Sequence, residues 1–117
     1  MRIKDETVHF GEVRQPMAGV LLTIADIFED ELGYAIITSA VDGRHSFKSA
    51  HYRGDATDWR TWTSEDSGEQ IPWAHKEIIV RRLQEKLGPA YDVVPEATHI
   101  HVEFDPKTLD EWETILT

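Results

Sequence analysis

The chain has 117 residues, of which 40% are hydrophobic and 29% charged, a composition typical of one soluble globular domain. Acidic residues outnumber basic ones by 22 to 12, and the formal charge of -10 opposes binding to nucleic acid or to an anionic membrane surface. There is no cysteine, so any metal must be bound by imidazole and carboxylate groups. We expect a single domain over 1–117, made in the cytoplasm without a signal peptide, and the sequence indicates no particular oligomeric state.

The first half of the chain predicts one helix, two short strands and a polar loop. Apolar residues recur at helical spacing over 17–31, and Gly33 is placed to end that helix. The run 34–38 has the pattern of a buried strand, and 56–59 that of a second, brief strand. The segment 44–55 between them is polar, as expected for a loop that carries functional residues.

The second half predicts a helix over 72–87, two strands over 91–94 and 99–104, and a terminal helix over 109–116. Gly88 and Pro89 stop the first of these helices. Its solvent face is expected to carry Lys76, Arg82 and Glu85. Helices combined with strands that are mostly not linked as βαβ units favour an α+β fold. Trp59, Trp62 and Trp73 are expected to fill the core.

The run His99–Phe104 (HIHVEF) alternates strictly between polar and apolar residues. Ile100, Val102 and Phe104 therefore face one side of the strand, and His99, His101 and Glu103 face the other. The apolar side is explained as core. The polar side places two imidazoles together. Either an exposed strand face or a metal site would explain this arrangement.

A second group of candidate ligands lies upstream, where His51 and Asp58 are separated by a turn and by the small residues Gly54 and Ala56. Gly54 permits a backbone conformation that other residues resist, and Ala56 leaves space near Asp58. Catalytic zinc sites commonly use three protein ligands and leave the fourth position to water. Two histidines and one aspartate fit that pattern.

The pattern Ser-x-His-x-x-Gly-x-Ala-x-Asp, complete from Ser49 to Asp58, is followed by His-x-His at His99 and His101. This combination resembles the M15 peptidase superfamily, which includes D-Ala-D-Ala carboxypeptidases and dipeptidases, phage endolysins, murein endopeptidases and the hedgehog signalling domain. The resemblance implies zinc ligands at His51, Asp58 and His101, on a small antiparallel sheet flanked by helices. The activity it implies is cleavage of cell-wall peptides.

The resemblance leaves the general base open, because many relatives place a glutamate three residues before the last ligand and this chain has Thr98 there. Glu96 and His99 are the substitutes, and we expect them to act together, with Glu96 favoured as the base. Relatives often supply an arginine upstream of the first ligand to stabilise the oxyanion. Arg44 is the candidate for that role here, with Arg53 as its substitute.

Two functions follow as hypotheses. The first is a zinc metallopeptidase that hydrolyses peptidoglycan stem peptides or cross-links, of the kind that phages and prophages encode, acting after release to the cell wall or as part of a virion. The second is a non-catalytic, zinc-bearing binding or structural module, because hedgehog shows that such a site persists in a protein that works by binding.

Overall fold

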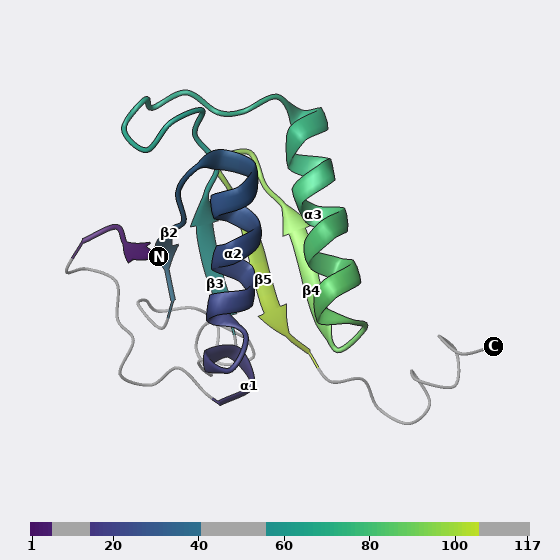
Figure 1. Ribbon diagram of the computed structural model, residues 1–117. Helices are drawn as coiled ribbons and strands as arrows, with labels where there is room; N and C mark the ends of the chain where they lie inside the picture. The colour runs from purple at the N-terminus through teal and green to yellow at the C-terminus, as the bar shows by residue number, and fades with distance from the viewer. Residues whose placement is uncertain (6–14, 41–55, 106–117) are drawn as a thin grey trace.

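The computed structural model describes residues 1–5, 15–40 and 56–105, and within them two long helices cover one face of a five-stranded sheet (Figure 1). The elements are β1 (Arg2–Ile3), α1 (Gln15–Ala18), α2 (Leu21–Leu32), β2 (Ile36–Ser39), β3 (Ala56–Arg60), α3 (Trp73–Leu87), β4 (Tyr91–Pro95) and β5 (His99–Phe104). The strand order is β1-β2-β3-β5-β4. The α+β class is confirmed. The terminal helix expected over 109–116 lies outside the described residues.

The sheet is mixed, so the prediction of an antiparallel sheet is wrong at one edge. β2, β3, β5 and β4 pair antiparallel in turn, whereas β1 pairs parallel with β2. The backbone N–H of Arg2 donates to Ala35 O at 2.8 Å, and that of Lys4 donates to Ile37 O at 2.7 Å. Two residues are too few to show a strand period in the sequence, which is why β1 was not predicted.

The helix predicted over 17–31 is two helices, because the chain turns between α1 and α2 and Val20 occupies the N-cap of α2 without a side-chain hydrogen bond. Gly33 ends α2 as predicted, with φ of 82°, a left-handed conformation that glycine adopts without strain. Among the described helices, none combines the length and apolar character needed to cross a bilayer.

The core lies between the helices and the sheet and is centred on Trp59. Its ring stacks on Phe28 of α2, with 5.3 Å between ring centroids and 10° between the planes. The indole N–H of Trp59 donates to the hydroxyl of Thr57 at 2.8 Å, and both side chains are fully buried. Trp62 is only partly buried and Trp73 is 51% exposed, so the expectation that the tryptophans fill the core holds for Trp59 alone.

The buried stripe of α3 includes a lysine, contrary to the prediction that Lys76 faces solvent. Lys76 is 2% exposed and lies one turn before Ile79 on the face that also buries Leu83. Its ammonium donates to the backbone carbonyls of Glu96 and Ala97, at 2.7 and 2.9 Å, in the turn between β4 and β5. Burial lowers the pKa of Lys76. The two carbonyls offset the cost of burying the cation and tie α3 to that turn.

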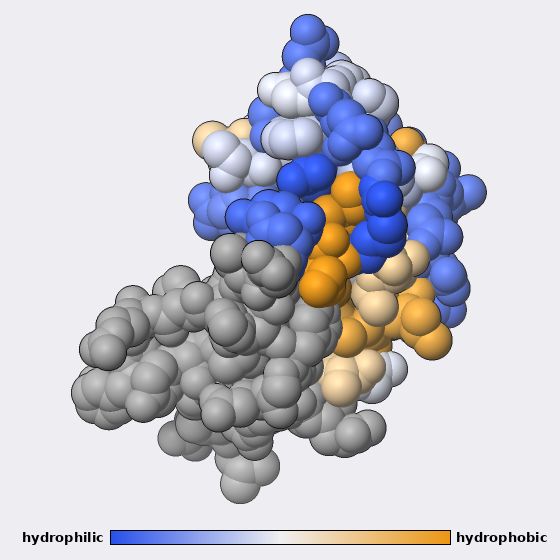
Figure 2. All heavy atoms as spheres, turned by 90° about the vertical axis from the view of Figure 1, so that its left-hand side faces the viewer, coloured by the Kyte–Doolittle hydropathy of each residue, from blue (hydrophilic) through white to orange (hydrophobic). Residues whose placement is uncertain are grey.

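The edge of the sheet at β1 faces the viewer in Figure 2. Polar residues occupy the upper part of this view, and an apolar strip is exposed between two polar zones lower down. Ile3 of β1 is 45% exposed. A short strand limits the unpaired backbone that such an edge offers to another chain.

Replacing Lys76 by methionine tests the tie between α3 and the turn. Lys76→Met keeps an unbranched apolar stem but leaves the carbonyls of Glu96 and Ala97 without the ammonium donor. We expect the free energy of unfolding in urea to fall by about 1–3 kcal/mol. Lys86→Met, at an exposed position in the last turn of α3, should change it by less than about 0.5 kcal/mol. Equal effects of the two substitutions would contradict the assigned contact.

Candidate metal centre

The sheet face turned away from α2 and α3 is polar where β3 and β5 meet. Strand alternation sends Trp59 into the core and leaves its neighbours Asp58 and Arg60 on the opposite face. β3 and β5 pair so that Asp58 stands opposite His101 and Arg60 opposite His99. Residues that are 43 positions apart in the sequence are therefore direct cross-strand neighbours.

Two carboxylates hold the imidazole of His101. Its Nδ1 donates to Asp58 Oδ1 at 2.8 Å, and its Nε2 donates to Glu103 Oε1 at 3.0 Å. Burial lowers the pKa of His101, but the hydrogen bonds and charges of Asp58 and Glu103 raise it more, and the net pKa is about 9. Both ring nitrogens are engaged, so the orientation of the ring is fixed.

His99 lies on the same face, beside Asp58. Its Nε2 is 3.5 Å from Asp58 Oδ1, and its Nδ1 is 2.9 Å from the hydroxyl oxygen of Thr98. A ring that carries its proton on Nε2 satisfies both contacts, because the Thr98 hydroxyl then donates to Nδ1 and Nε2–H points to Asp58. In the sequence Thr98 was notable only because it replaces the glutamate that many relatives have. In the structure its hydroxyl orients the ring of His99.

Glu96 stands across the turn from His99. The Glu96 N–H donates to His99 O at 2.8 Å, which extends the β4–β5 register by one pair and puts both residues on one face. The Glu96 side chain is exposed, and its carboxylate makes no hydrogen bond or ion pair with another described residue.

Of the six site residues predicted from the sequence, the structure brings together Asp58, His99 and His101 and places Glu96 across the turn from His99. The other two, His51 and Arg44, lie outside the described residues, so their placement stays a prediction. Glu103 was recognised only as a member of the polar face. The strict alternation of β5 was the signal that linked it to His101.

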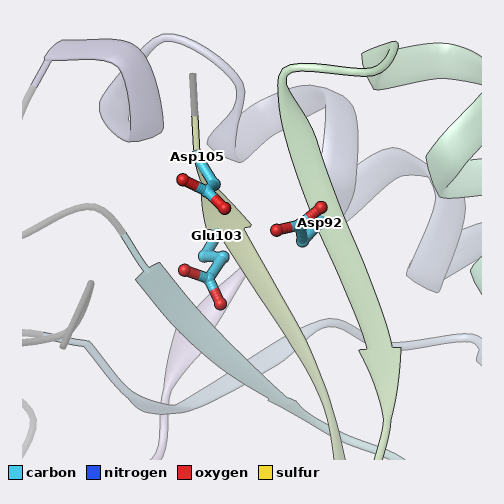
Figure 3. Close-up of side chains that lie close together, drawn as sticks. All are labelled: Asp92, Glu103 and Asp105. Atoms are coloured by element: carbon cyan, nitrogen blue, oxygen red, sulfur yellow. The ribbon is translucent and has the colours of Figure 1, made fainter. Parts of the chain in front are cut away.

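A second group of possible ligands lies where β4 begins and β5 ends, as Figure 3 shows. Asp92 on β4 is in register with Glu103 on β5, and Asp105 follows β5. One oxygen from each carboxylate lies within 4.8 Å of the other two, so this cluster could hold a metal ion. In the described part of the chain no other trio of His, Asp or Glu converges so closely. An all-oxygen set suits hard cations such as Ca²⁺ or Mg²⁺ better than zinc.

Comparisons with protein-family models, with curated proteins and with solved structures found no significant match for this chain.

The contact between Glu103 and His101 predicts a specific change in titration. In the presence of a chelator, Glu103→Gln should lower the pKa of His101 by about 1 unit, since one of two neighbouring negative charges is removed. NMR titration of the imidazole signals measures this. Because the wild-type pKa of about 9 lies above the ordinary 6.5, the stability that His101 contributes is complete below pH 6.5 and is lost as the pH rises through 9.

Glu69→Gln, which removes an exposed carboxylate from the loop before α3, is the matched control and should leave the His101 titration unchanged. A His101 pKa that does not move in Glu103→Gln would show that Glu103 does not hold the ring.

Proposed function

We propose that the chain is a zinc-dependent peptidase of the M15 superfamily that hydrolyses peptidoglycan stem peptides or cross-links. One observation carries the proposal: Asp58 and His101, which the motif nominates as ligands, are opposed in register with 2.8 Å between a carboxylate oxygen and an imidazole nitrogen. One carboxylate and two imidazoles, with His51 as the third donor, form a ligand set that catalytic zinc sites use. The α+β fold, in which the described helices α2 and α3 lie on the sheet face opposite to Asp58 and His101, also supports it.

The surroundings of His101 suit a metal ligand. Its Nδ1 faces Asp58 and is the nitrogen on the proposed metal side, whereas Nε2 is held by the Glu103 carboxylate. Histidines that bind metals commonly donate their second N–H to a carboxylate or carbonyl, which orients the ring and raises its basicity. Glu103 supplies that support here.

A zinc ion held by these residues would lower the pKa of its water to about 7 and polarise the scissile carbonyl. His99 and Glu96 are the two proton-transfer candidates. With Nδ1 accepting from Thr98, the proton of His99 is on Nε2 beside Asp58, so His99 is placed to donate a proton to the leaving amine. Glu96 lies on the same face, paired with His99, and its carboxylate is the candidate general base.

Two observations support the second candidate function, a non-catalytic zinc-bearing module. The exposed carboxylate of Glu96 has no partner among the described residues, and Thr98 stands where many relatives have a glutamate. The formal charge of -10 opposes adsorption to an anionic envelope, so activity on intact cells is a weaker expectation than activity on isolated wall fragments. Zinc content and product formation separate the two functions.

Zinc-loaded protein incubated with isolated peptidoglycan should release new amino groups and new muropeptides, detected by mass spectrometry. Zinc at one equivalent per chain, by elemental analysis, should accompany this activity. Asp58→Ala and His51→Ala should lose most of the bound zinc, and full zinc content in either variant would refute the ligand assignment. Stoichiometric zinc without any product under all conditions would favour the non-catalytic module.

The base is identified by variants that keep the metal. Glu96→Gln should retain zinc and lose activity by about 10²- to 10⁴-fold, the usual contribution of a positioned general base. His99→Gln, which removes the proton donor, should also retain zinc and should lose less. His75→Gln is the control, because His75 lies on α3, where its Nε2 contacts Glu31 Oε1 at 2.9 Å, and should leave activity unchanged. The reverse order of effects would assign the base to His99.

A further inference from the structure

A pocket of about 460 Å³ lies beyond His99, on the sheet face turned away from α2 and α3. Its walls come from segments that are distant in the sequence: the residue after β1, strands β2 and β3, the loop between β3 and α3, and the start of β5. The residues that matter for its chemistry are Lys4, Thr38, Arg60, Trp62, Gln70 and His99.

The loop wall of the pocket is held by hydrogen bonds. The Gln70 amide donates to Thr98 O at 3.1 Å, and its oxygen accepts from the hydroxyl of Thr61 at 2.5 Å. Trp62 forms a β-bridge with Gln70, and Trp62 O accepts from the hydroxyl of Tyr34 at 2.7 Å. The pocket is therefore shaped before any ligand arrives, which lowers the entropic cost of binding.

Two cations line this pocket in a chain that is strongly acidic overall. The Arg60 guanidinium lies over the Trp62 ring, 3.9 Å from its centroid, and one of its N–H groups donates to Glu65 O at 3.1 Å. The carboxylate of Glu65 pairs with Arg2 instead. Within the described residues, neither Arg60 nor Lys4 has a carboxylate partner. The stacking fixes the plane of the guanidinium and leaves most of its five donors for a ligand.

The pocket continues the candidate metal centre. Arg60 is two residues beyond Asp58 on β3 and is paired with His99, so it lies about 7 Å along the strand from Asp58. That length matches about two residues of an extended peptide. A ligand lying across Asp58 and His101 would reach Arg60 with a group one or two residues away.

We propose that Arg60 and Lys4 form a carboxylate-binding subsite that receives an acidic group of a peptide ligand, one or two residues from the group held at Asp58 and His101. A guanidinium fork matches a carboxylate in two parallel hydrogen bonds. The carboxylate of Asp58, two residues from Arg60 on β3, disfavours anions of higher charge. The inference rests on the proposed function in one respect, namely that the ligand is a peptide. Its carboxylate can be the C-terminal group or that of a side chain.

Two pairs of acetylated peptides, made with L and with D residues, test the subsite by NMR titration of the zinc-loaded protein. N-acetyl-trialanine is compared with its C-terminal amide, and N-acetyl-Ala-Glu-Ala amide with N-acetyl-Ala-Gln-Ala amide. In at least one pair, we expect the peptide with the carboxylate to bind about tenfold more tightly than its neutral partner. The pair that shows this difference identifies the carboxylate as C-terminal or as that of a side chain. Hydrolysis is followed in the same samples.

Arg60→Gln should reduce the affinity for the acid to that of its neutral partner, and Lys4→Gln, an exposed substitution that leaves the fold intact, should reduce it in part. Arg81→Gln removes the same charge from the exposed face of α3 and should change nothing. Equal affinity for acid and neutral peptides in both pairs, no binding at all, or acid selectivity that survives both Arg60→Gln and Lys4→Gln would overturn the inference. Selective binding that depends on Arg60 but gives no hydrolysis would support the subsite and count against the peptidase.

Discussion

The antiparallel register between β3 and β5 determines where the described polar groups of these two strands lie on the sheet face turned away from α2 and α3. Asp58 meets His101 because Trp59, its neighbour on β3, is buried against Phe28 on the other side of the sheet. A shift of the β3–β5 pairing by one residue would turn Trp59 to the face away from the helices and Asp58 into the core, which the packing forbids. The apolar core thus positions the polar site, although no core side chain belongs to it.

The same register also determines where negative charge lies on this face of the sheet. Glu103 contacts His101 and also belongs to the trio with Asp92 and Asp105, so it joins the two possible metal-binding groups. At the other end of β3 and β5 the charges change sign, with Arg60 and Lys4 at the pocket beyond His99. The face therefore runs from acidic to basic across the pair of histidines, and a ligand with one negative end has one favourable direction in which to lie.

The parts of the site that follow from local pattern were predictable, and the parts that depend on distant contacts were not. Alternation in HIHVEF placed the two histidines and Glu103 on one face, and the motif singled out Asp58. Lys76 was placed in solvent because residue type alone treats lysine as polar, whereas the carbonyls that receive its ammonium lie 20 and 21 residues away. The role of Thr98 depends on a side-chain torsion that spacing does not report.

The ammonium of Lys76 has a consequence for the dynamics of the turn that carries Glu96 and Thr98. Hairpin turns on a protein surface usually open without disturbing the core, and their amides exchange with solvent quickly. Here the carbonyls of the two consecutive residues Glu96 and Ala97 accept hydrogen bonds from the side chain of Lys76, which lies in the buried stripe of α3. The turn is thereby coupled to the helix, and we expect it to open together with α3. The backbone amides at the end of the site that carries Glu96 should then exchange more slowly than those of an ordinary surface turn.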